Sequence, residues 1–195
     1  RGEFFDVVDR DPDDVLNVLV FGGSQGSRAI NNAVIDALAL LKATGSAIHL
    51  MHQTGETDFD EVKAAYNEND WQNADIRPYI VNMVEAFANA DVIISRAGAT
   101  TCAEVAAAGK AAIMIPLPTA ADDHQRKNAE ALVRNGAARM ILQKDLTGET
   151  LANELNALST DKAVLNAMGK AARQMARPDA AEATVDLIES LRKRK

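Results

Sequence analysis

Residues 18–27 read VLVFGGSQGS, an apolar run that ends in a glycine-rich turn. The same order recurs at residues 91–104, DVIISRAGATTCAE, where a second glycine-rich turn opens a helical pattern. In a doubly wound α/β sheet the first and fourth strands usually lie side by side, and ligands bind in the crevice at this point. Both turns would bring free backbone N–H groups and a helix N-terminus to that crevice, which favours a bound diphosphate. Glu104 follows about one turn into the second helix, where its carboxylate can accept hydrogen bonds from a ribose diol.

The whole chain alternates apolar runs with helical patterns. Buried parallel strands are predicted at residues 15–21, 47–51, 76–80, 92–95, 111–117 and 139–142. Helical patterns lie between them at residues 27–41, 59–67, 81–89, 101–108 and 125–135, and follow them at residues 150–158, 162–176 and 181–194. Gly109 and Gly136 stand where C-terminal helix caps belong, and residues 9–14 are predicted as a linker or edge loop. The sequence therefore predicts a single domain over residues 1–195 with a Rossmann-like, doubly wound parallel α/β sheet of about six strands.

Motifs and composition disfavour several classes of protein. The first turn lacks the Gly-x-Gly-x-x-Gly spacing of dinucleotide sites, and no acid ends the second strand. No Gly-Lys-Ser/Thr follows either turn, so ATP hydrolysis is disfavoured as well as NAD binding. The formal net charge of −7 argues against a nucleic-acid partner, and no apolar run approaches the roughly 18 residues of a membrane span. Cys102 is the only cysteine, which excludes an internal disulfide, and its small neighbours favour a packing role.

Motifs at residues 22–28, 52–55, 95–104 and 123–129 occur in an order and at a spacing that resemble one known family. They are similar to the C-terminal, donor-binding half of the MurG family of UDP-N-acetylglucosamine transferases, and the resemblance covers essentially the whole chain. It implies the C-terminal domain of a GT-B glycosyltransferase. It also implies an inverting transfer of N-acetylglucosamine from the UDP-N-acetylglucosamine donor to the C4 hydroxyl of the muramyl sugar of lipid I, which gives lipid II in peptidoglycan synthesis.

The resemblance also implies which parts of the reaction lie elsewhere. The family's acceptor site for lipid I and its proposed general base belong to an N-terminal half, so no catalytic residue is expected in this chain. No metal ion or other cofactor is expected, because backbone amides and a helix N-terminus would meet the departing diphosphate. The full protein is expected at the cytoplasmic face of the bacterial inner membrane as a peripheral protein, and this fragment as a soluble one. The helices within residues 160–195 are expected to pack toward the missing domain.

Matched position by position, the resemblance implies a set of donor-binding residues: Arg1, Ser24, Gln25, Ile80, Met83, Ala99, Thr100, Glu104, His124 and Gln125. Ser24 and Gln25 belong to the diphosphate loop, Arg1 matches an arginine that contacts a phosphate, and Glu104 matches the glutamate that binds the ribose. An ordinary turn role is the alternative for Ser24 and Gln25, but their place directly after a buried strand favours the phosphate role. Glu104 is equally an acid favoured near a helix N-terminus by the dipole.

The remaining matched residues concern the base and the sugar. The backbone of Ile80 would read the uracil edge, and Met83 would wall the base, with ordinary helix packing as its alternative. His124 and Gln125 match the pair that contacts the N-acetylglucosamine hydroxyls, although many relatives carry glutamine at the first position. Asn128 would either brace this loop or touch the ligand.

Other polar residues are predicted to have structural roles. Asp122 and Asp123 are candidate N-caps for the helix that follows, and a metal site formed by both with His124 is the alternative. Arg28 is interpreted as a solvated helix residue and His52 as a brace between neighbouring loops. The basic residues 192–195 are interpreted as a solvated helix end, with weak attraction to anionic lipid as the alternative.

Two other classes of function stay open. One is a different nucleotide-sugar enzyme on the same two-domain plan, such as an epimerase or a lipid glycosyltransferase. The other is a nucleotide-binding module without catalytic activity. Donor selectivity among UDP-sugars would separate the first from a MurG-like enzyme, and the upstream gene sequence would separate the second.

Overall fold

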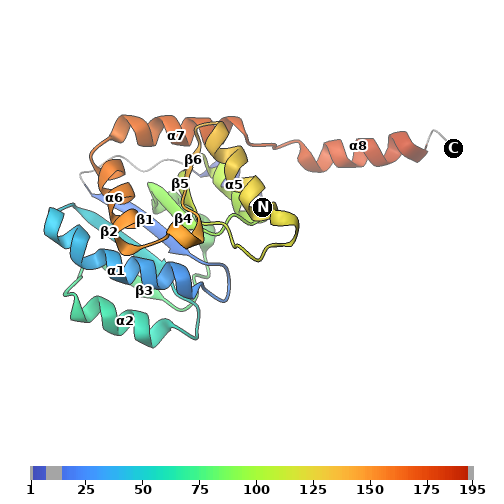
Figure 1. Cartoon of the computed structure of the whole chain (residues 1–195). Helices are drawn as coiled ribbons and strands as arrows, with labels where there is room; N and C mark the ends of the chain where they lie inside the picture. The colour runs from blue at the N-terminus through green and yellow to red at the C-terminus, as the bar shows by residue number, and fades with distance from the viewer. Residues whose placement is uncertain (1, 8–14, 193–195) are drawn as a thin grey trace.

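A parallel sheet lies at the centre of the structure, a computed structural model that describes residues 2–7 and 15–192 (Figure 1). Its strands are β1 (Leu16–Phe21), β2 (Ile48–Gln53), β3 (Ala74–Arg77), β4 (Val92–Ser95), β5 (Ala111–Met114) and β6 (Ala138–Met140). The strand order is β3-β2-β1-β4-β5-β6. β1 lies beside β4, with Val18 opposite Val92 and Phe21 opposite Ser95. The predicted doubly wound sheet is confirmed, and both glycine-rich turns leave neighbouring strands at the same edge.

Helices cover both faces of this sheet (Figure 1). They are α1 (Arg28–Thr44), α2 (Phe59–Glu68), α3 (Met83–Asn89), α4 (Ala99–Ala108), α5 (His124–Arg134), α6 (Gly148–Ser159), α7 (Lys162–Gln174) and α8 (Ala180–Arg192), with 3-10 turns η1 (Gly2–Asp6), η2 (Ala121–Asp123) and η3 (Gln143–Asp145). Val18 and Val20 share a core cluster with α1, α2 and α6, whereas Leu19 and Phe21 share the opposite cluster with η1, α3, α4 and α5. Because successive strand residues point to opposite faces, β1 is buried on both sides and reads as a continuous apolar run.

Some predicted boundaries differ from the observed ones. β3 spans Ala74–Arg77 instead of residues 76–80, because Pro78 has no N–H to donate to the ladder with β2. α4 begins at Ala99 instead of residue 101, which makes Glu104 the sixth residue of the helix and places it beyond the first turn. The other strands and helices differ by a few residues at their ends. The predicted linker at residues 9–14 lies outside the described residues.

α8 extends away from the sheet and from the helices that cover it (Figure 1). Its large apolar side chains are all more than half exposed: Val185, Leu187, Ile188 and Leu191. In the described parts of the chain, no helix has the length and apolar composition needed to cross a bilayer.

Candidate functional site

The first glycine-rich turn joins β1 to α1. The loop after β2 packs against one side of it, and the other side is open. Gly26 has a φ of 76°, and a Cβ built on it would lie 1.9 Å from the carbonyl oxygen of Thr54. Only glycine therefore fits against the loop that follows β2. Gly23 has a φ of 101°, but a Cβ there would meet nothing within 4 Å. Ser24 and Gln25 lie between these glycines and are exposed, so the turn presents a free side to a ligand.

The second glycine-rich turn leads from β4 into α4. Its N-cap residue, Gly98, has no side chain to accept from the first N–H groups of the helix, and these groups have no acceptor within the helix itself. A Cβ at Gly98 would meet nothing within 4 Å, and Ala99 and Thr100 are exposed. This turn therefore offers backbone donors at the positive end of a helix, an arrangement suited to a phosphate.

Arg96 joins the two turns. It directly follows β4, and its Nη2 donates to the hydroxyl of Ser27, the N-cap residue of α1, at 2.7 Å. The same nitrogen donates to Oε1 of Gln143 at 2.7 Å, and Nη1 donates to the carbonyl oxygens of Ile115 and Pro116 at 3.2 and 3.3 Å. Burial lowers the pKa of Arg96 from its usual value. The guanidinium thus fixes the start of α1 relative to β4 and the end of β5.

Gln53 makes a second connection at the same edge of the sheet. This buried last residue of β2 donates from Nε2 to the carbonyl oxygen of Gly23 at 2.8 Å. Its Oε1 accepts from the backbone N–H of Ile80 at 2.8 Å. The predicted base-reading segment and the predicted diphosphate loop are therefore held by one side-chain amide.

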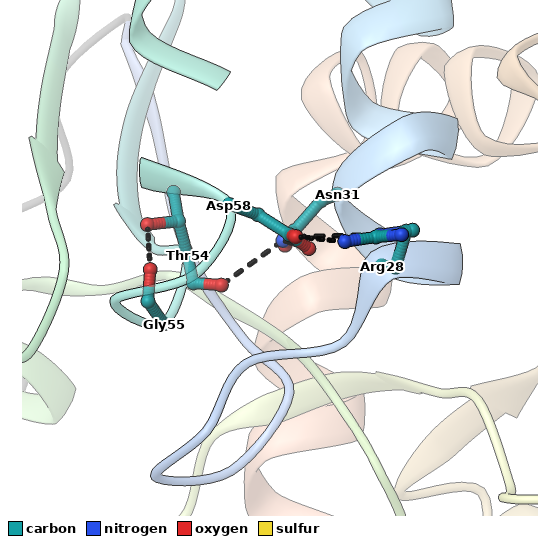
Figure 2. A network of polar contacts seen from close by, with 5 residues as sticks. All are labelled: Arg28, Asn31, Thr54, Gly55 and Asp58. Atoms are coloured by element: carbon teal, nitrogen blue, oxygen red, sulfur yellow. Dashed lines mark hydrogen bonds and ion pairs between the residues drawn. The ribbon is translucent and has the colours of Figure 1, made fainter. Parts of the chain in front are cut away.

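A polar network anchors the first turn from behind (Figure 2). Arg28 is exposed, in agreement with its interpretation as a solvated helix residue, and it also donates to Oδ1 of Asp58 at 2.9 Å. Asn31 donates to Oδ2 of Asp58 and to the carbonyl oxygen of Thr54, both at 3.0 Å. Thr54 in turn donates from its hydroxyl to the carbonyl oxygen of Gly55 at 2.9 Å. The network ties the start of α1 to the loop between β2 and α2.

His52 extends this network into the core. Its ring nitrogens lie 3.1 Å from Oδ1 of Asn31 and 3.1 Å from the hydroxyl of Tyr66. Burial lowers the pKa of His52 from 6.5 to about 3, so the imidazole is neutral near pH 7. Since the Asn31 oxygen can only accept, Nε2 of His52 carries the proton and Nδ1 accepts from Tyr66. His52 is fully buried, and its contacts agree with the predicted bracing role.

Glu104 lines a pocket of about 490 Å³ beside α4. Ala99 and Thr100 of the predicted donor site also line this pocket. Its other walls include Phe4 of η1 and the segment between α7 and α8. Glu104 is partly exposed on the second turn of α4. The helix-dipole explanation for this acid is therefore weakened, because that effect falls off within the first turn.

The loop after β5 holds the predicted sugar-contacting pair. Oε1 of Gln125 accepts from the backbone N–H of Leu117 at 3.0 Å, so Gln125 braces the loop. This bond leaves Nε2, a donor, as the other end of the amide. Nδ1 of exposed His124 donates to the carbonyl oxygen of Ala121 at 2.8 Å, and Nε2 is the second polar atom of the ring. Each side chain therefore has a bracing atom and a second polar atom.

The acids before this pair do not cap the helix as predicted. Asp123 is the N-cap residue of α5 but makes no side-chain cap hydrogen bond. Its φ of 55° is left-handed, whereas capping residues usually have extended backbone, and Asp122 is also left-handed with a φ of 50°. Within the described residues, no group of three His, Cys, Asp or Glu side chains is placed to hold a metal ion. Asn128 donates to the carbonyl oxygen of Ala97 at 3.1 Å and so braces the second turn.

Three predicted donor-binding residues remain: Ile80, Met83 and Arg1. Ile80 is buried, and partly buried Met83 packs against the same core cluster, which agrees with its packing alternative. Arg1 lies outside the described residues. Arg96 and Gln53 were missed as site-building residues, although both stand at the carboxyl end of a buried strand. That position is the signal that could have identified them.

Comparisons with known proteins agree with this geometry. The family model described as glycosyltransferase family 28 C-terminal domain matches residues 17–184. A curated relative from Geobacter sulfurreducens is 48% identical over 182 residues, which cover 93% of this chain and 50% of the relative. Its name is UDP-N-acetylglucosamine--N-acetylmuramyl-(pentapeptide) pyrophosphoryl-undecaprenol N-acetylglucosamine transferase.

Solved structures give the same result. The crystal structure of Acinetobacter baumannii MurG matches with a TM-score of 0.85 and 37% identity, over 96% of this chain and 55% of that one. The co-structure of S. aureus MnaA with UDP matches with a TM-score of 0.66 over 98% of this chain and 48% of that one, but its 12% identity shows the fold alone. The chain spans about half the length of the curated relatives it matches. Because the family model covers most of its residues, the chain belongs to the glycosyltransferase family 28 C-terminal domain family.

Proposed function

We propose that this chain is the donor-binding part of an N-acetylglucosaminyltransferase that binds UDP-N-acetylglucosamine. The observation that carries the proposal is the pair of open glycine-rich turns at the carboxyl ends of adjacent β1 and β4, with Glu104 following in α4. Their backbone donors suit a diphosphate, and the carboxylate suits the neighbouring hydroxyls of a ribose. The similarity to named transferases supports N-acetylglucosamine as the transferred sugar.

The other proposed contacts with UDP-N-acetylglucosamine involve polar atoms for which the structure gives no hydrogen bond among the described residues. The Ile80 N–H is engaged by Gln53, so a base would meet this backbone at its carbonyl oxygen, an acceptor that suits the N3–H of uracil. Nε2 of Gln125 and Nε2 of His124 are the atoms proposed to meet the sugar hydroxyls. Ser24 and Gln25 are proposed to lie along the diphosphate.

The proposed reaction is an inverting transfer from the donor to the C4 hydroxyl of lipid I, giving lipid II. The acceptor oxygen forms a bond to the anomeric carbon, and the bond from that carbon to the diphosphate oxygen breaks on the opposite face. The bonding electron pair leaves with UDP, while the hydroxyl proton passes to a general base in the other half of the full protein. The two turns stabilise the negative charge that develops on UDP, because their donors are already oriented before the reaction.

The full protein is also proposed to work at the cytoplasmic face of the inner membrane, where a lipid-linked acceptor would be reached. The helices of residues 160–195 are proposed to pack toward the other half. The exposed apolar side chains of α8 support this, because packing against a second domain would remove their surface from water.

Binding and transfer measurements test the proposal. The chain as printed is titrated calorimetrically with UDP-N-acetylglucosamine, UDP-N-acetylgalactosamine and UDP-glucose, with magnesium and with EDTA. We expect the first ligand to bind best, and to bind equally well in EDTA. We expect no transfer of radiolabelled sugar to lipid I by this chain alone, because catalysis needs both reactants held within attack distance. Failure to bind any UDP-sugar would overturn the donor-site proposal, and robust transfer by the chain alone would overturn the division of roles.

A further inference from the structure

Arg96 is a cation in an electrostatically unfavourable position. Its guanidinium contacts Ser27, the N-cap residue of α1, and its backbone lies two positions before Gly98, the N-cap residue of α4. The N-terminus of α1 carries partial positive charge, which disfavours a nearby cation. The acceptors of its hydrogen bonds are a hydroxyl, an amide oxygen and two carbonyl oxygens, and all of them are neutral.

Three other arginines of the described residues have their charge balanced. Arg28 pairs with Asp58, and Arg139 pairs with Glu154. Arg173 donates to the carbonyl oxygens of Ala107 and Ala108 at the C-terminal, negative end of α4. Arg96 forms no ion pair with a carboxylate in the described part of the chain, and it is half-buried. A half-buried cation beside the positive end of α1 is costly unless an anion completes the site.

We propose that Arg96 is a positioning residue whose charge is balanced by the diphosphate of the bound ligand. This inference rests on the proposed function. It names Arg96 as the residue whose positive charge, held beside the first turn by the bond to Ser27, attracts the diphosphate. The hydrogen bonds of its guanidinium go to other groups of the protein, so Arg96 acts on the ligand through the electric field of its charge and through Ser27. Burial lowers the pKa of Arg96, because the charged guanidinium loses part of its hydration.

If Arg96 acts through its charge, its contribution to ligand affinity should increase with the negative charge of the ligand. If it only braces the turns, its contribution should not depend on that charge. The negative charge rises from uridine through UMP to UDP, while the nucleoside stays the same. The Arg96→Gln variant keeps a hydrogen-bonding amide and loses the charge. We expect it to weaken UDP binding by about tenfold or more and uridine binding by less than about threefold, with UMP between them.

Two further variants separate charge from bracing. Arg96→Lys keeps the charge but lacks the planar fork that reaches several acceptors. We expect this variant to retain most of the UDP affinity, whereas a pure bracing role predicts losses like those of Arg96→Gln. Arg28→Gln is the matched control, because Arg28 also opens α1 but is neutralised by Asp58. We expect any affinity loss in this control to be the same for all three ligands.

The experiment is a competition titration of uridine, UMP and UDP with the wild type and these variants, after circular dichroism has confirmed folding. Equal loss for uridine and UDP in Arg96→Gln would overturn the inference while leaving the proposed function intact. If Arg96→Gln does not fold, loss of UDP affinity in a folded Arg96→Lys variant would overturn it instead. Absence of UDP and UDP-N-acetylglucosamine binding in the wild type would mean that the proposed function itself has failed.

Discussion

Gly26 and Thr54 are packed backbone against backbone, with only 1.9 Å between a Cβ built on Gly26 and the carbonyl oxygen of Thr54. The reverse contact is equally close, because a Cβ built on Gly55 would lie 2.2 Å from the carbonyl oxygen of Gln25. The first glycine-rich turn and the loop after β2 therefore pack closely against each other, and this clasp depends on Gly26 and Gly55 having no side chain. Asn31 and Gln53 reinforce the clasp with hydrogen bonds to Thr54 and Gly23.

Gly26→Ala should lower the free energy of unfolding by more than the usual cost of a left-handed residue. That cost is about 1–2 kcal/mol, and the clash with Thr54 adds to it. Gly45→Ala is the matched control: Gly45 has a φ of 68°, but a Cβ there would meet nothing within 4 Å. Urea unfolding of both variants gives the comparison. Equal losses in the two variants would show that the turn can open without cost.

Glu104→Ala should weaken UDP binding ten- to hundredfold, because charge-assisted hydrogen bonds to a ribose are worth about 1.5–3 kcal/mol. The fold should survive, since Glu104 is partly exposed and lies outside both core clusters. Calorimetry with UDP and 2′-deoxy-UDP makes the test specific. The wild type should prefer UDP, and the variant should bind both ligands alike. A variant that keeps the preference would remove Glu104 from the ribose site.

Gln125→Glu should separate sugar binding from loop bracing. Glutamate keeps an oxygen that can accept from Leu117, but its second oxygen cannot donate to a sugar oxygen as the amide N–H does. The added negative charge should weaken both diphosphate ligands, and the lost donor should weaken UDP-N-acetylglucosamine further. Gln125→Ala removes both bonds, so it should also weaken UDP by loosening the loop. If Gln125→Glu weakens both ligands equally, bracing is the only role of this side chain.

The central strands and their order could be predicted because their signals are local. β1 and β4 are buried on both faces, so their apolar runs are continuous, and the glycine-rich turns mark where they end. β3 was placed too late along the chain, because this edge strand carries Asp75 and Arg77 and is at most half-buried. Its strand character comes from pairing with β2, which no local pattern reveals.

The candidate site was predictable only where a residue stands in a recognisable motif. Ser24, Ala99 and Glu104 were predicted as ligand-binding residues in this way, and their ligand contacts stay predictions. The contacts that build the site are long-range. Arg96 bonds to Gln143, and Gln53 bonds to Ile80, pairs whose members are 47 and 27 positions apart. Polar side chains at such separations have no periodicity that predicts their partners, so these roles needed the structure.

The stability of the chain should fall as the pH is lowered from 6.5 to 5, in part because of His52. Burial lowers the pKa of this imidazole to about 3, whereas the unfolded chain binds the proton near pH 6.5. Above pH 6.5 neither state is protonated there, and the full stability is present. Below it the unfolded state binds more protons, so the free energy of unfolding decreases by up to about 1.4 kcal/mol per pH unit until the pH approaches 3.

The His52→Gln variant isolates this contribution. Glutamine can still donate to Asn31, but it does not titrate, so unfolding free energies measured between pH 6.5 and 5 should change less steeply than in the wild type. The variant should be less stable at pH 7, because it loses the packing of the buried imidazole against Tyr66. The two stabilities should therefore converge as the pH falls. Carbon chemical shifts of the wild-type ring should also report a neutral imidazole at pH 5. Parallel stability curves, or a protonated ring at that pH, would show that His52 is accessible to water and does not hold the loops through a buried network.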